Sequence, residues 1–226
     1  MTVYYFSGSG HSAAVAAALA KQLRCETRDI LLESYRSEEV AAVVFPVYCQ
    51  NIPGPVKTFL KALTTRYVVL IATYGKISFG NVLHEAQKLV CSTVIAGAYI
   101  PIGHTFLRGD CSFREDFLHA IVRRIHNPKA VKIPRTAKNP FADLFPGWRS
   151  RMGVKIVKTD RCRGCGACQQ ICHTGAMQEG VPNRRCIRCL RCVTNCPHHA
   201  LEFKNRWVLK QYLIRYYKKD DYMLYL

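Results

Sequence analysis

The cysteine spacing of the C-terminal half constrains the fold of this chain more than any other feature. Of 12 cysteines, eight form two copies of the pattern C-x2-C-x2-C-x3-C, at Cys162, Cys165, Cys168 and Cys172 and again at Cys186, Cys189, Cys192 and Cys196. Disulfide scaffolds are short, secreted and cysteine-dense throughout, whereas the other four cysteines here are scattered singly. Structural zinc uses paired C-x2-C knuckles separated by a longer stretch. The clustered cysteines therefore indicate a metal centre other than zinc.

The doubled run resembles that of bacterial two-cluster ferredoxins. In that pattern, three thiolates at two-residue gaps wrap one face of a [4Fe–4S] cubane, and the fourth points to the other cluster. The resemblance implies that the first cluster is held by Cys162, Cys165, Cys168 and Cys196. It implies that the second cluster is held by Cys186, Cys189, Cys192 and Cys172. Because the ligands cross over, we expect the two halves to depend on each other.

The repeat also predicts two similar halves, each with a short strand, a cysteine loop and a helical turn. Residues 156–157 and 201–203 are expected to form the outer strands. Two positions depart from the usual ferredoxin pattern: His173 stands where proline is usual, and Leu190 stands where glycine is common. Neither change removes a ligand, but both are expected to affect hydrogen bonding to sulfur and solvent access, which help to set the reduction potential.

The first 127 residues alternate strand and helix patterns. Apolar, β-branched runs predict strands at residues 2–6, 27–31, 40–47, 68–73 and 93–100. Helix patterns fall at residues 12–23, 53–63, 82–90 and 113–125. This alternation predicts an α/β fold with a doubly wound, parallel, five-stranded sheet. The link between residues 31 and 40 is too short for a full crossover helix, so we expect only a turn or two there.

A loop rich in serine and glycine follows the first strand. It offers backbone N–H groups and hydroxyls at a helix N-terminus, which suits a phosphate. Ala13 breaks the dinucleotide spacing G-x-G-x-x-G, and no Gly-Lys-Ser/Thr follows as in a Walker loop. A monophosphate site remains, with a plain tight turn as the alternative.

The same loop, Ser7-Gly8-Ser9-Gly10-His11-Ser12, resembles the FMN phosphate loop of the flavodoxin family. Residues 46–53 and 73–80 resemble that family's second and third flavin loops, and all three follow strands, where open α/β sheets bind ligands. The resemblance implies FMN, with a phosphate held by Ser7, Gly8, Ser9, Gly10, His11 and Ser12. It implies that the isoalloxazine is framed by Tyr48, Cys49, Gln50, Asn51, Thr73, Tyr74, Gly75 and Phe79. Phe79 and Tyr48 are the first choices for stacking, and Cys49 is interpreted as a small loop residue in preference to a redox thiol.

These patterns divide the chain into four parts. Residues 1–127 are expected to form the flavodoxin-like domain, and residues 155–205 a small α+β ferredoxin-like domain with both clusters. Residues 128–154 form a proline-containing linker without regular structure, anchored by Phe141, Leu144, Phe145 and Trp148. Residues 206–226 read as an aromatic and basic helix docked on the ferredoxin module, with contact to a partner or a membrane surface as the alternative.

The net charge of +18 is concentrated in residues 128–226, which hold 20 Lys and Arg against 6 Asp and Glu. Such a field favours acidic redox partners, and Arg161, Arg163, Arg184, Arg185, Arg188 and Arg191 flank the cluster loops. No apolar run is long enough to cross a membrane, and residues 1–9 lack the basic start of a secretion signal. We therefore expect a cytoplasmic protein without an integral membrane segment, and the oligomeric state stays open, a homodimer included.

As a whole, the chain resembles flavodoxin–ferredoxin fusion proteins of the EFR1 type. The resemblance implies an electron transfer protein that couples one-electron clusters to a flavin holding one or two electrons. The first alternative is an FMN-dependent reductase with its own small substrate, so whether the protein is an enzyme stays open, and no catalytic residue is assigned. The second alternative, a basic nucleic-acid-binding protein, would leave the three flavin-type loops without a purpose, and no nucleic acid is expected.

Overall fold

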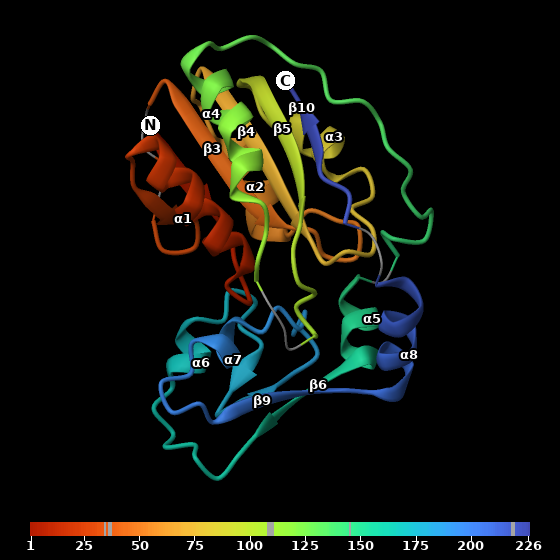
Figure 1. Cartoon of the computed structure of the whole chain (residues 1–226). Helices are drawn as coiled ribbons and strands as arrows, with labels where there is room; N and C mark the ends of the chain where they lie inside the picture. Colours follow the sequence, from red (N-terminus) through yellow and green to blue (C-terminus); the bar gives the residue numbers. More distant parts are fainter. Residues whose placement is uncertain (34, 36–37, 108–110, 145, 218–219) are drawn as a thin grey trace.

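The computed structural model describes residues 1–33, 35, 38–107, 111–144, 146–217 and 220–226. Figure 1 shows an upper lobe built around one sheet and a smaller lower lobe. The strands of the upper sheet are β1 (Thr2–Tyr5), β2 (Thr27–Asp29), β3 (Val40–Pro46), β4 (Tyr67–Tyr74), β5 (Thr93–Pro101) and β10 (Met223–Tyr225). They lie in the order β10-β5-β4-β3-β1-β2. The parallel strands β2-β1-β3-β4-β5 have the order of flavodoxin-like sheets, so this mixed α/β lobe is consistent with the expected fold.

Helices cover both faces of the sheet. On one face, α1 (His11–Leu23) packs beside the 3-10 turn η1 (Glu115–Phe117) and α4 (Leu118–His126), and on the other face lie α2 (Gly54–Ala62) and α3 (Val82–Gln87). Strands β3 and β4 pair in parallel, with Val43 beside Leu70, and are buried along almost their whole length. A strand covered on both faces needs a continuous apolar run, which explains why these central strands were predictable.

The sheet has six strands, so the expectation of five was wrong. Strand β10 pairs antiparallel with β5, with Met223 beside Tyr99 and Tyr225 beside Gly97. Just before it, the backbone carbonyl of Asp221 accepts a hydrogen bond from the Tyr74 hydroxyl at 2.9 Å. Residues 206–226 are therefore not one helix: the chain leaves the lower lobe and returns to the edge of the upper sheet, where Figure 1 places the C-terminus.

The lower lobe has the repeated plan that the sequence predicted. Its outer strands β6 (Val154–Lys158) and β9 (Leu201–Asn205) pair antiparallel, which confirms the strands expected around residues 156–157 and 201–203. Each cysteine loop leads into one helical turn, α6 (Ala167–Gln170) or α7 (Arg191–Thr194), and β7 (Met177–Gln178) pairs with β8 (Val181–Pro182) between them. In the described part of the chain, no helix is long and apolar enough to cross a membrane.

The segment between the lobes differs from its prediction in two ways. It ends in a helix, α5 (Pro146–Gly153), which lies beside α8 (Trp207–Tyr216), as Figure 1 shows. The expected anchors are mostly in solvent: Phe141, Leu144 and Trp148 are 68%, 58% and 50% exposed. Phe145 lies outside the described residues. Ile133 and Ala142 are fully buried instead, because small or aliphatic side chains fit where the segment crosses the upper lobe.

Candidate functional site

The loop between β1 and α1 is a hydroxyl-lined turn at the N-terminus of a 13-residue helix. Gly10 takes a left-handed conformation with φ of 92°, and its N–H donates to Ser7 Oγ at 3.1 Å. Ser9 Oγ lies 3.3 Å from His11 Nδ1, and Ser12 Oγ lies 2.8 Å from Thr73 Oγ1. The first turn of α1 carries no acidic residue, so the positive end of the helix dipole faces this loop unopposed.

The second loop is a tight turn in which two non-glycine residues are left-handed. Tyr48 and Asn51 exchange backbone hydrogen bonds of 3.0 and 2.9 Å, while Cys49 and Gln50 have φ of 51° and 63°. Each left-handed residue costs about 1–2 kcal/mol, and such strain persists only where the surroundings impose it. Burial raises the pKa of the Cys49 thiol, which agrees with its interpretation as a loop residue and not a reactive thiolate.

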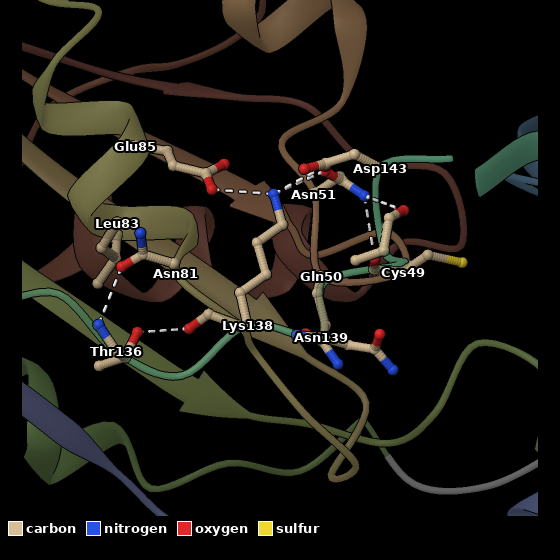
Figure 2. A network of polar contacts seen from close by, with 12 residues as sticks. Cys49, Gln50, Asn51, Asn81, Leu83, Glu85, Thr136, Lys138, Asn139 and Asp143 are labelled. Atoms are coloured by element: carbon tan, nitrogen blue, oxygen red, sulfur yellow. Dashed lines mark hydrogen bonds and ion pairs between the residues drawn. The ribbon is translucent and has the colours of Figure 1, made fainter. Parts of the chain in front are cut away.

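The segment between the lobes holds this second loop in place (Figure 2). Lys138 Nζ lies 2.9 Å from Glu85 Oε1, 2.8 Å from Asp143 Oδ1 and 3.1 Å from Asn51 Oδ1. Asn51 Nδ2 also donates to the Ala142 carbonyl at 2.9 Å. The linker therefore has a structural role that the sequence did not reveal: it supports the strained turn from behind.

In the third loop, the aromatic side chains of Tyr74 and Phe79 contact other parts of the upper lobe. Phe79 stacks on Tyr99 with ring centroids 4.1 Å apart, and it packs against the core on the α2 and α3 face. The Tyr74 hydroxyl is bonded to the Asp221 backbone. Phe79 lines none of the cavities described below, whereas Gly75 lines all three of those at the strand ends.

Two connected cavities open at the carboxyl ends of the strands. One, of about 460 Å³, is lined by Tyr48, Cys49, Asn51 and Gly75. The other, of about 260 Å³, adds Gln50 and reaches α5 and α8. The sequence analysis missed several lining residues: His104, Phe106, Arg149, Ile187, Arg188 and Tyr212. His104 and Phe106 directly follow β5, so the rule that pointed to the other strand ends could also have found them.

His104 is a partly buried histidine that lines both cavities. The Phe106 N–H donates to its Nδ1 at 3.2 Å, which leaves the proton of the neutral ring on Nε2. Burial, and then the nearby His11, lower the pKa of His104 from its usual 6.5 to about 4. The side chain is therefore neutral at pH 7.

This histidine makes the fold sensitive to acid. Because the unfolded chain binds a proton on His104 near pH 6.5 and the folded chain only near pH 4, stability falls as the pH drops between these values. The expected loss between pH 7 and pH 5 is about 2 kcal/mol. The check is anaerobic urea unfolding of the native protein and of His104→Asn, whose Oδ1 can still accept from Phe106. If the free energy of unfolding fell equally with pH in the two proteins, this would contradict the lowered pKa of His104.

The structure brings the cysteines together in the crossed arrangement. A cavity of about 280 Å³ in the lower lobe is lined by Cys162, Cys165, Cys168 and, from the second run, Cys196. Burial raises the pKa of Cys192 to about 12, and the neighbouring thiols that raise it further include Cys172 of the first run. These placements agree with the expected crossed arrangement, in which each cluster takes one thiolate from the other run.

Matching backbone hydrogen bonds reach one sulfur in each run. Ala176 N–H donates to Cys172 Sγ and Ala200 N–H to Cys196 Sγ, both at 3.3 Å. Burial raises the pKa of Cys172, but hydrogen bonds, first from the Thr174 hydroxyl, outweigh burial and hold it below its usual value. Among the described residues, no three potential ligands converge as a single metal ion requires, whereas a cubane binds each thiolate through a different iron.

The two cysteine loops reach the same backbone conformation with different residues. The first run has three left-handed glycines. Gly164 lies two residues after the first cysteine, Gly166 directly after the second, and Gly175 three residues after the fourth. The second run has Arg188, Leu190 and His199 at the corresponding positions, with φ of 59°, 64° and 45°. The conformation is therefore set by the cluster loop, and the second run maintains it at a cost that glycine avoids.

The second cysteine loop packs directly on the loop between β1 and α1. Gly8 lies so close to the Cys189 carbonyl oxygen that a Cβ at this position would overlap it. Arg191 reaches from α7 into the upper lobe, where Nη1 donates to the Ser7 carbonyl at 3.0 Å and Nη2 to Asp29 Oδ2 at 2.6 Å. The rings of Phe6 and His173 also meet edge to face at 5.2 Å.

Comparison with known proteins identifies the lower lobe. Two family models, each described as a 4Fe-4S binding domain, match residues 159–175 and residues 181–202. Each stretch contains one complete cysteine run. A search of curated proteins returned no match. The chain therefore carries two ferredoxin-type 4Fe-4S domains, which support iron–sulfur electron transfer.

Proposed function

We propose that the chain is an iron–sulfur flavoprotein that transfers electrons between two [4Fe–4S] clusters and one FMN. The observation that carries the proposal is the cavity of about 460 Å³, because both lobes line it. Tyr48 and Gly75 come from the expected flavin loops, while Ile187 and Arg188 lie between two ligands expected for the second cluster. A group bound in this cavity would contact both modules.

The cavity and its surroundings fit FMN. A small cavity at the start of α1, lined by Ser7, Ser9 and Ser12, shares Tyr48 and Gly75 with the large one. A phosphate would lie at the helix N-terminus, and the large cavity falls within the size range of cofactor sites. Tyr48 is the remaining candidate to contact the ring. FMN would supply a centre that holds one or two electrons, whereas each cluster carries one.

The exposure of the cysteines suggests the direction of transfer. Cys165, a ligand expected for the first cluster, is exposed, while Cys186 and Cys192, two ligands expected for the second cluster, are buried. The second run also packs on the phosphate loop through Cys189 and Gly8. We infer that partner proteins exchange electrons with the first cluster at the surface and that the second cluster exchanges them with the flavin.

Cofactor content tests this proposal directly. We expect about eight iron atoms, from two cubanes, and one FMN per chain after anaerobic purification. The measurement is iron and sulfide analysis together with chromatography of the released flavin. Iron near eight with no flavin retained, or with FAD in place of FMN, would contradict the flavoprotein assignment.

The partner is proposed to be an acidic redox protein that docks near the first cluster. Not all of the arginines that flank the cluster loops are available to a partner. Arg191 is buried, and Arg188 is partly buried and donates a hydrogen bond to the Val154 carbonyl at 3.0 Å. Arg161 is exposed but paired with Glu202, whereas Arg163 next to Cys162 is exposed. The rate of reduction by an acidic ferredoxin should fall with rising ionic strength, and a salt-independent rate would oppose the idea.

The cavity of about 260 Å³ supports a second candidate, a reductase with its own small substrate. It adjoins the proposed flavin site and is lined by Ile77, Met152, Val208 and Leu209, with Arg149 as a cation. This composition suits a small, mainly apolar acceptor. Turnover of such an acceptor by the flavin-loaded protein, without any partner protein, would favour this candidate over the electron carrier.

A further inference from the structure

We propose that Arg191 and Asp29 form a buried charge pair in which each side chain offsets the effect of the other on the reduction potential of the second cluster, with Arg191 acting as a positioning residue between the lobes. The two side chains are 7% and 8% exposed, and their charged atoms lie 2.6 Å apart. Arg191 stands between Cys189 and Cys192, two ligands expected for this cluster, and Asp29 ends β2 of the upper lobe. The inference rests on the 4Fe-4S assignment of this run and not on FMN.

A purely structural purpose does not explain this pair well. Buried ion pairs are often no more stabilising than apolar residues of similar size, because both charges lose their hydration. The internal repeat also indicates that the cysteine loop does not need this arginine to fold. The first run has Ala167 at the position of Arg191, and α6 forms there as α7 does in the second run. The loop therefore folds without the arginine, and the arginine occurs only at the cluster that faces the upper lobe.

The electrostatic reason is direct. Reduction adds one negative charge to a cluster, so a nearby cation stabilises the reduced form and a nearby anion destabilises it. The effect is stronger in a buried, poorly screened site than in water. With both partners present, the two effects largely cancel. When one partner is removed, the charge of the other is no longer compensated. The two single variants should therefore shift the reduction potential in opposite directions.

The contacts of the pair indicate how each variant will behave. Arg191 Nη1 also donates to the Ser7 carbonyl, while its Nε is buried without a hydrogen-bond partner among the described residues. Asp29 Oδ1 accepts from the Leu31 N–H at 3.0 Å, an acceptor that asparagine retains. Burial, and then Arg191, lower the pKa of His173. Asp29→Asn is therefore the gentlest change: it keeps the acceptor for the Leu31 N–H and removes the negative charge and the acceptor for Arg191 Nη2.

The experiment is an anaerobic redox titration followed by electron paramagnetic resonance on the native protein, Arg191→Ala, Asp29→Asn, the double variant and Arg191→Lys. We expect one cluster to respond and the other to serve as the internal reference. The one-electron equilibrium constant for reduction of the second cluster should fall at least tenfold in Arg191→Ala and rise at least tenfold in Asp29→Asn. Each change corresponds to a shift of about 59 mV in the reduction potential. The double variant should lie between them.

Arg191→Lys separates charge from positioning. It keeps the cation but not the forked contact with Ser7 and Asp29, so it should preserve the potential and weaken the contact between the lobes. A shift in Arg191→Lys as large as in Arg191→Ala would overturn the proposal. Shifts of the same sign in Arg191→Ala and Asp29→Asn would also overturn it. Should Arg191→Ala lose the cluster, an unchanged potential in Asp29→Asn would still contradict it.

Discussion

Replacing Cys172 with serine is expected to remove the cluster of the second cysteine run and leave that of the first. Cys172 belongs to the first run by sequence, but its thiol interacts with Cys189 and Cys192. Replacing Cys196 should have the opposite effect, because Cys196 lines the cavity of the first three cysteines. In each variant, iron should fall from about eight to about four atoms per chain.

Reference variants identify which cluster is lost. Cys186→Ser should remove the second cluster and Cys162→Ser the first, so each supplies the magnetic resonance spectrum of the cluster that remains. The spectrum of Cys172→Ser should match that of Cys186→Ser. Cys91→Ser, at an exposed cysteine of the upper lobe, should retain all the iron. A match between Cys172→Ser and Cys162→Ser would mean that each run binds its own cluster.

Gly8→Ala is expected to loosen the contact between the lobes. A methyl group at Gly8 would overlap the backbone carbonyl of Cys189 and lie 2.7 Å from the Tyr48 hydroxyl. Backbone cannot move aside as a flexible side chain can, so the cost should be about 1–3 kcal/mol or more. Because electron transfer weakens steeply with distance, we also expect slower transfer between the second cluster and the proposed flavin.

A matched glycine provides the control for this variant. Gly54 begins α2, and a Cβ there meets nothing within 4 Å. Gly54→Ala should therefore be neutral or slightly stabilising, by about 0.4–1 kcal/mol. The comparison uses anaerobic denaturant unfolding, because Gly54 also lines the cavity of about 460 Å³ and is no control for the rate of flavin reduction. Gly8→Ala and Gly54→Ala proteins that behave alike would show that the loops do not touch in solution.

The sequence predicted the parallel sheet and the repeated lower lobe because both leave strong local patterns. Strands covered on both faces, such as β3 and β4, need continuous apolar runs. The cysteine spacing and the outer strands β6 and β9 follow from one repeat. Strand β10 left no such pattern, since three residues pair with β5 only after the chain has folded back from the lower lobe.

The sequence predicted the loops of the candidate site that follow strands of the upper sheet. It did not predict the residues that lie where the two lobes meet. The loops after β1, β3 and β4 follow the strand-end rule, and the same rule could have pointed to His104 after β5. Arg191 was taken for a surface arginine, because a buried arginine resembles an exposed one until its partner Asp29 is known. Phe79 was expected at the flavin because it is aromatic, but it instead fills the core beside Tyr99. Contacts between distant segments decide such cases.

Flash photoreduction of the anaerobic, cofactor-loaded protein tests the central claim most directly. A one-electron pulse is delivered to the clusters, and the absorbance of the flavin is followed over a range of protein concentrations. Transfer within one chain predicts a first-order rate of flavin reduction that does not depend on protein concentration and that is lost when Cys189→Ser removes the second cluster. A rate proportional to protein concentration, or one unchanged in Cys189→Ser, would contradict electron transfer through the contact between the lobes.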